Sequence, residues 1–233
     1  MAKSRFSFVK LQGTIGGLTF VESKAYGTHS RLPRGTHKEA KLNGVLQKNS
    51  DAAREVGAAA SPLLRQIKAC CGSFVQGNLW QRMMGRMFQA TSTSLEDLLF
   101  SLQGLEVNEA YPVSRLIQPM PLINALCTKN KLRVELNTGS HCYFPKDVKE
   151  DCYYYTLTVL WVNGSGRCTH MTTETEWIGR EDALPQYDLS FERPQWASQY
   201  LLLLGVQAGR EQRPVERFSA MGVQIVNSGV CKI

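Results

Sequence analysis

The chain has few of the features that mark a secreted or membrane-spanning protein. The segment from Met1 to Phe8 has a basic beginning but no apolar stretch of about 7 to 15 residues, which a secretory signal needs. The longest apolar run, Tyr200 to Val206, is far shorter than the roughly 20 residues that cross a bilayer. We therefore expect no signal peptide, no membrane partner, and a location in the cytoplasm or in an assembled particle.

Motifs that carry catalytic chemistry are also missing. The glycine block Gly13 to Gly17 lacks the Lys-Ser/Thr of a phosphate-binding loop and the spacing of a dinucleotide fingerprint. The sequence contains no Gly-x-Ser-x-Gly elbow and no His-Glu-x-x-His pair. None of the four histidines adjoins a carboxylate at a spacing that would orient it. The sequence predicts a protein that is not an enzyme, with no catalytic residues and no cofactor.

The seven cysteines do not suggest a disulfide framework, because their number is odd and the chain is long. Zinc sites are typically built on Cys-x-x-Cys pairs, and the sequence has none. The residues that come nearest to a metal-ligand cluster are His141, Cys142, Cys152, Cys168 and His170. Their wide and irregular spacing predicts free thiols and no metal site.

Electric charge is distributed very unevenly. The formal net charge is +7, and the first fifty residues account for all of it, with nine Lys and Arg against two Glu. The rest of the chain holds 18 basic and 18 acidic residues, which cancel. A basic, glycine-rich arm on a neutral body is suited to meeting a partner, such as an acidic protein surface or a nucleic acid.

The beginning of this arm has the pattern of a β-hairpin. Residues 5–11 and 18–22 are β-prone, and residues 12–17 between them contain three glycines, which permit a tight reversal. An isolated hairpin is marginally stable in water, so its apolar side chains need a covering surface on this subunit or on a neighbour. The predicted interaction residues are Phe6, Phe8, Gly13, Gly16, Gly17, Leu18 and Phe20.

After the hairpin, residues 24–43 are polar, basic and rich in Gly and Pro, which predicts an extended arm or loop. Its cations are placed along the chain in a way that suits a phosphate backbone or an acidic surface. The predicted contact residues are Lys24, Arg31, Arg34, Lys38 and Lys41. We take residues 1–44 as one segment, the basic arm with its hairpin.

Residues 45–108 have the pattern of three or four packed helices. The first begins near Leu46, and Ser61-Pro62 either caps a second helix or kinks a continuous one; Gly72 supplies a stop. A further helix over residues 74–90 places Phe74, Leu79, Met83, Met87 and Phe88 on one face, beside Arg82 and Arg86, which can bind an anion or simply be exposed. Thr93 and Glu96 form a capping-box pattern for the next helix.

From residue 109 the helical period gives way to short alternating segments. The predicted strands are residues 113–118, 131–136, 153–162, 167–178, 187–191, 199–206 and 218–226. Asn163-Gly164 marks the clearest hairpin turn. Seven short strands predict an antiparallel immunoglobulin-like β-sandwich over residues 109–233, and the chain as a whole is expected to be an α+β protein.

The order of these elements is similar to that of a known group of proteins. The segment Leu11 to Phe20 with its Gly-Thr-Ile-Gly-Gly block, the helix around residues 49–67 and Leu105-Glu106-Val107-Asn108 ahead of a β-rich half resemble an uncharacterised family of Bacteroidetes. The Gly-Thr-Ile-Gly-Gly block is the only specific motif of this resemblance. The residues Val21 to Lys24 and Gly44 to Lys48 differ from the family pattern. The resemblance implies no activity and no site residues.

Together these features favour a non-enzymatic structural or interaction protein that forms a homo-oligomer through its N-terminal arm. A phage-derived or virion-like role suits this layout by analogy of architecture. The alternative is a nucleic-acid-associated protein that binds phosphates through the same arm. A third hypothesis is an enzyme or ligand-binding protein with its site between the helices and the sandwich.

Overall fold

The computed structural model describes residues 13–15, 18–23, 27–31, 44–138, 150–183 and 185–231. The chain divides into two compact units, residues 1–47 and residues 48–233. Mixed α and β structure with antiparallel sheets confirms the predicted α+β class. None of the helices in the described residues combines the length and the hydropathy needed to span a membrane.

The N-terminal unit contains a three-stranded antiparallel sheet of β1 (Gly13–Ile15), β2 (Leu18–Ser23) and β3 (Gly27–Arg31), with β2 in the middle. The second strand of the predicted hairpin is thus confirmed, whereas its predicted partner, residues 5–11, lies outside the described residues. Residues 13–15, which the prediction placed in the turn, form β1 and pair with residues 18–20 of β2. The prediction of an extended arm or loop over residues 24–43 did not include β3, which forms at residues 27–31 and pairs with β2.

Helix α1 (Gly44–Cys71) runs through Pro62 without a break. Ser61-Pro62 therefore lies inside one continuous helix and does not cap a second one. Proline removes one backbone hydrogen bond from a helix interior. Tertiary packing offsets this cost, because Ala60, Leu63 and Ile67 on either side are fully buried. Gly72, with φ of +53°, ends the helix as predicted.

Two short helices follow, α2 (Leu79–Met87) and α3 (Leu95–Ser101). Helix α2 is shorter than the predicted range 74–90, because Gly72–Phe74 forms a separate 3-10 turn. Phe88 was predicted on the buried face, but it lies past the end of α2 and is half exposed. The predicted cap of α3 is wrong by one residue, since Ser94, not Thr93, accepts the hydrogen bond, from the amide of Asp97 at 3.2 Å.

The strands of the second unit form two antiparallel sheets. In the large sheet the main strands lie in the order β12-β10-β6-β7, while β8 pairs with β6 and β11 pairs with β10. The small sheet has the order β4-β5-β9. The strand bounds are β4 (Leu122–Cys127), β5 (Lys131–Asn137), β6 (Cys152–Val162), β7 (Cys168–Glu174), β8 (Ile178–Gly179), β9 (Gln186–Glu192), β10 (Gln199–Arg210), β11 (Arg213–Pro214) and β12 (Met221–Val230).

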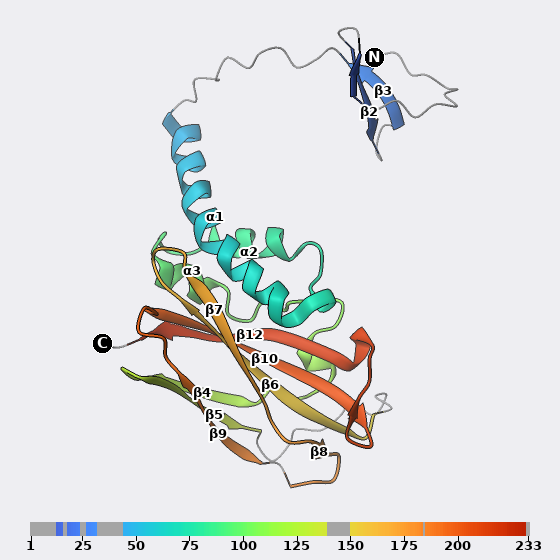
Figure 1. Ribbon diagram of the computed structural model, residues 1–233, viewed down its shortest axis with the longest axis vertical. Helices are drawn as coiled ribbons and strands as arrows, with labels where there is room; N and C mark the ends of the chain where they lie inside the picture. Colours follow the sequence, from blue (N-terminus) through green and yellow to red (C-terminus); the bar gives the residue numbers. More distant parts are fainter. Residues whose placement is uncertain are drawn as a thin grey trace. The chain divides into compact units, whose positions relative to one another are not determined.

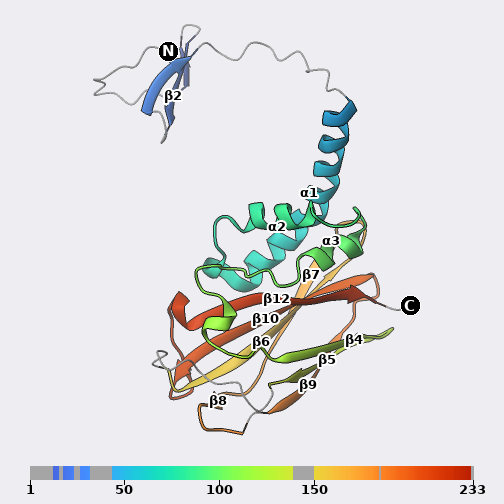
Figure 2. The ribbon, with the colours of Figure 1, turned by 180° about the vertical axis from the view of Figure 1, so that it is seen from behind.

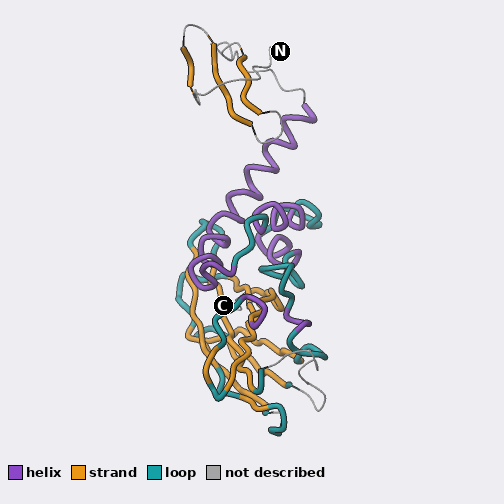
Figure 3. The backbone as a smooth tube through the Cα atoms, turned by 90° about the vertical axis from the view of Figure 1, so that its right-hand side faces the viewer, coloured by secondary structure: helices purple, strands orange, loops and turns teal. Residues whose placement is uncertain are grey.

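Helices and the small sheet cover opposite faces of the large sheet (Figures 1 and 2). In β6 the side chains alternate: Val159 and Trp161 belong to the core between the sheets, whereas Leu160 and Val162 belong to the core under the helices. The same alternation along β10 explains why both strands are almost entirely apolar and buried. Figure 3 shows the helices and strands of this unit from the side as separate layers. Helices and sheets therefore share one packed body.

Several strand predictions need correction. Residues 113–118 are not a strand, because Val113–Arg115 forms a 3-10 turn between Pro112 and Pro119. Strand β4 was not predicted at all. Residues 218–220 form another 3-10 turn, so β12 begins only at Met221. The turn at Asn163-Gly164 between β6 and β7 is confirmed. The immunoglobulin-like arrangement of the strands stays a prediction.

Candidate functional site

The sheet of the N-terminal unit has no closed core among the residues whose side chains the structure describes. Leu18 is 41 % exposed, and Thr19, Phe20, Val21 and Ser30 are each only half-buried. Alternation along β2 places Leu18 and Phe20 on one face and Val21 on the other. Apolar side chains on both faces are therefore still in contact with water, which is unusual for a stable small sheet. We treat this sheet as a candidate interaction surface.

The beginning of α1 is also uncovered. Among the described side chains of residues 44–55 none is buried, and Val45 is 68 % exposed. The first buried side chain of the helix is Val56. Helices are marginal in water without tertiary packing, so these first three turns gain little stability from the body of the protein. They form a second surface that a partner can cover.

The structure brings together only some of the predicted interaction residues. Gly13 pairs with Phe20 across β1 and β2, and Leu18 lies on the same face of β2 as Phe20. Arg31 ends β3 opposite Thr19. The other predicted residues lie outside the described residues: Phe6, Phe8, Gly16, Gly17, Lys24, Arg34, Lys38 and Lys41.

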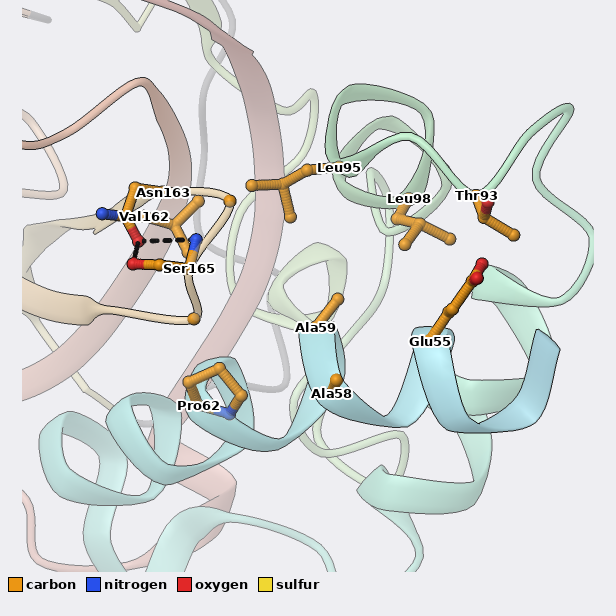
Figure 4. A pocket seen from close by; sticks show the side chains of 12 residues that line it. Glu55, Ala58, Ala59, Pro62, Thr93, Leu95, Leu98, Val162, Asn163 and Ser165 are labelled. Atoms are coloured by element: carbon orange, nitrogen blue, oxygen red, sulfur yellow. Dashed lines mark hydrogen bonds between the residues drawn. The ribbon is translucent and has the colours of Figure 1, made fainter. Parts of the chain in front are cut away.

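A cavity of about 430 Å³ lies between α1, α3 and the turn after β6 (Figure 4). Its lining from α1 includes the small residues Ala58, Ala59 and Pro62, and from α3 it includes Leu98. The side-chain oxygen of Asn163 accepts hydrogen bonds from the amide and the hydroxyl of Ser165, at 3.2 and 2.8 Å, and so shapes the turn at its edge.

Glu55 is the only titratable residue among those that line this cavity. A general acid–base pair needs a second titratable group, which this lining does not offer. Thr93, Asn163 and Ser165 add neutral polar groups to a lining that is otherwise mostly apolar. Sequence reasoning missed it because its walls come from three distant segments, and the Asn163 turn was the only local signal.

Arg82 and Arg86, considered above as an anion site, are instead used within the fold. Arg82 donates to the carbonyl oxygens of Glu106 and Val107 at 2.7 and 3.0 Å and forms an ion pair with Glu109 at 3.5 Å. Arg86 donates to the carbonyl oxygen of Gln103 at 2.6 Å. These bonds fasten α2 to the segment that leads into the β region, and so they have a structural explanation.

Glu106 lies beside this arginine in a partly buried position. One carboxylate oxygen accepts from the side-chain amide of Gln224 at 2.9 Å, and the other accepts from the amide of Val113 at 3.3 Å. Burial of the carboxyl group raises the pKa of Glu106 to about 7, although these hydrogen bonds and Arg82 act in the opposite direction. Its charge therefore changes near neutral pH.

A variant Glu106→Gln is expected to become more stable relative to the wild type as the pH rises. Between pH 4.5 and 7 the folded protein keeps the Glu106 proton that the unfolded chain has lost, so the stability contributed by this group falls as pH rises through that window. Because the side chain is only partly buried, we expect a relative gain of about 1 to 2 kcal/mol at pH 8 compared with pH 4.5. Urea unfolding at both pH values measures it. The exposed Glu181→Gln is the control, and a pH-independent difference for Glu106→Gln would contradict the prediction.

In the described part of the chain, no three His, Cys, Asp or Glu side chains lie together in a way that could hold a metal ion. Cys168 and His170 are both on β7, and Nδ1 of His170 lies 2.7 Å from the side-chain oxygen of Gln66 on α1, which gives the histidine a packing role. His141 and Cys142 lie outside the described residues.

No protein-family model, no curated protein and no solved structure matches this chain. Its membership of the uncharacterised Bacteroidetes family stays a prediction.

Proposed function

We propose that this protein is a non-enzymatic structural or interaction protein that forms homo-oligomers through its N-terminal unit. The observation that carries the proposal is the three-stranded sheet in which none of the described side chains is buried. A sheet this small needs packing against another element to be stable. The uncovered first turns of α1 follow it in the sequence and give a partner a second surface.

Assembly would proceed by arm exchange. Leu18 and Phe20 pack against a neighbouring copy, and β1 and β3, each of which pairs only with β2 among the described residues, offer backbone groups to another strand. The arm cations meet an acidic surface of that neighbour. If each copy gives and receives an arm, the contact closes into a ring or continues into a tube or particle. A phage-derived or virion-like role, in the cytoplasm or in an assembled particle, is consistent with this mechanism.

The double substitution Leu18→Ser with Phe20→Ser is expected to abolish assembly. We expect the intact protein to elute as a multiple of 26.1 kDa at low and at high salt, because the contact is apolar, and the variant to elute as a 26.1 kDa monomer. Light scattering on a sizing column measures both masses. The matched control is Phe100→Ser, which removes an aromatic ring that is 66 % exposed on the second unit and should leave the mass unchanged. An intact protein that is already monomeric, or a double variant that keeps the oligomeric mass, would rule out this mechanism.

The alternative function is nucleic-acid binding by the same arm, and it rests on the concentration of the whole net charge in the first fifty residues. Each phosphate that a cation neutralises adds about 0.9 to the salt slope of binding to duplex DNA. This alternative predicts copurifying material that absorbs at 260 nm and is lost at high salt, leaving monomer. Absorbance at 260 and 280 nm, recorded in the same sizing experiment, distinguishes the two functions.

A further inference from the structure

A second cavity, of about 210 Å³, lies between the last turn of α1 and the helix-facing side of the large sheet. Two adjacent thiols, those of Cys70 and Cys71, line it from the helix. Polar side chains face it from the strands, and the hydroxyls of Thr158 and Thr172 lie 2.9 Å apart. The polar lining from the strands comprises Tyr154, Thr156, Thr158, Thr172, Glu174 and Gln207. This mixture of thiols and hydroxyls in one cavity is not explained by core packing.

The two sulfur atoms are held close together. The Sγ atoms of Cys70 and Cys71 are 3.6 Å apart, and both side chains are half-buried, so solvent reaches them. Two bonds of about 2.3 Å that diverge from one atom at the tetrahedral angle end about 3.8 Å apart, as in zinc–thiolate sites. One soft atom can therefore bond to both sulfurs with very little movement of the helix end.

The two thiols are also hydrogen-bonded to each other. Thiolate is the form of cysteine that binds soft atoms, so both thiol protons leave when the ligand binds.

We propose that Cys70 and Cys71 form a two-thiol binding site for a soft, thiophilic metal or metalloid centre. Because the described residues supply no group of three ligating side chains, the site suits a centre that is satisfied by two thiolates. An organic arsenic(III) oxide is such a centre. Two sulfur–arsenic bonds form, the two thiol protons leave with the oxygen as water, and no atom is oxidised or reduced. All residues that line this cavity belong to the second unit, so the proposal does not rest on the proposed assembly.

The experiment uses phenylarsine oxide, added in equimolar amount to the reduced full-length protein, and intact-protein mass spectrometry as the readout. We expect one adduct per chain, with the loss of one water, and we expect Cys70→Ser and Cys71→Ser each to lose it. Two controls should keep it: Cys168→Ser, whose half-buried thiol has its pKa raised to about 12 by burial, and Cys231→Ser, whose thiol is buried beside Cys127.

Serine is close to cysteine in size, and circular dichroism verifies that each variant is folded before the arsenical is added. If both the Cys70→Ser and the Cys71→Ser variants still form the adduct, the site lies elsewhere and the proposal is wrong. Loss of the adduct only in Cys231→Ser would assign the adduct to the Cys127–Cys231 pair and contradict the proposal. Absence of any adduct on the intact protein would also overturn the proposal.

Discussion

Replacing Trp161 with alanine is expected to lower the free energy of unfolding by about 3 to 5 kcal/mol. Trp161 is fully buried between the two sheets, and its ring lies edge-on to Tyr200 at a centroid distance of 6.4 Å. Removing the indole leaves a cavity at the centre of the core, and the rigid sheets on both sides can close it only in part. The loss is measured by urea unfolding followed by far-ultraviolet circular dichroism and by fluorescence.

The control for this prediction is Trp161→Phe, which keeps most of the apolar volume. The indole N–H of Trp161 has no hydrogen-bond partner within the described structure, so phenylalanine removes an unsatisfied donor while it creates a smaller cavity. We expect the free energy of unfolding to fall by less than about 1.5 kcal/mol. Because the helices and the small sheet both pack on the large sheet, the circular dichroism and fluorescence transitions should shift together in the alanine variant. A circular dichroism transition that keeps its wild-type midpoint would show that the layers unfold separately.

The second large effect is expected from Arg217→Met. The carboxylate of Glu150 is 2 % exposed and forms an ion pair with Arg217, whose own side chain is 48 % exposed. Removing the arginine leaves a charge that is buried without its partner, and this usually costs more than the pair itself contributes. Because solvent can still approach from the side of Arg217, we expect a loss of about 2 to 3 kcal/mol, measured by urea unfolding at pH 7.

A double variant separates the loss of the ion pair from other effects of the substitution. Glu150→Gln combined with Arg217→Met removes both charges and should recover most of the stability. Arg213→Met, an exposed arginine on β11, is the matched control and should change stability by less than about 0.5 kcal/mol. If the double variant is no more stable than Arg217→Met alone, the buried charge is not the cause of the loss.

The strands with the strongest local signals could be predicted from the sequence. β6 and β10 are long apolar segments, and the turn between β6 and β7 carries an Asn-Gly pair, so pattern and structure agree. β4 was missed because two prolines precede it and because its exposed positions include Leu122 and Leu126, so the sequence does not alternate between apolar and polar residues. The segment 113–118 was assigned wrongly for a related reason: its apolar side chains are buried in the core, but the flanking prolines favour a turn.

Some of the candidate sites could also be predicted from the sequence, and others could not. The N-terminal residues Leu18 and Phe20 were identified from local features, the glycine block and the concentration of charge, which need no tertiary structure. The two cavities could not be predicted, because each is lined by segments that only the fold brings together. Cys70 on α1 and Thr172 on β7, for example, line one cavity although about a hundred residues separate them.

Pro62 affects which kind of guest molecule the cavity of Figure 4 can bind. A proline has no amide hydrogen, so the carbonyl oxygen of Ala58, one turn earlier in α1, lacks the donor that an α-helix normally supplies. Both residues line that cavity, together with the polar side chains of Glu55, Thr93, Asn163 and Ser165. We therefore expect a guest that carries an N–H or O–H group to be held there more tightly than a hydrocarbon of the same shape, since it can donate to these acceptors.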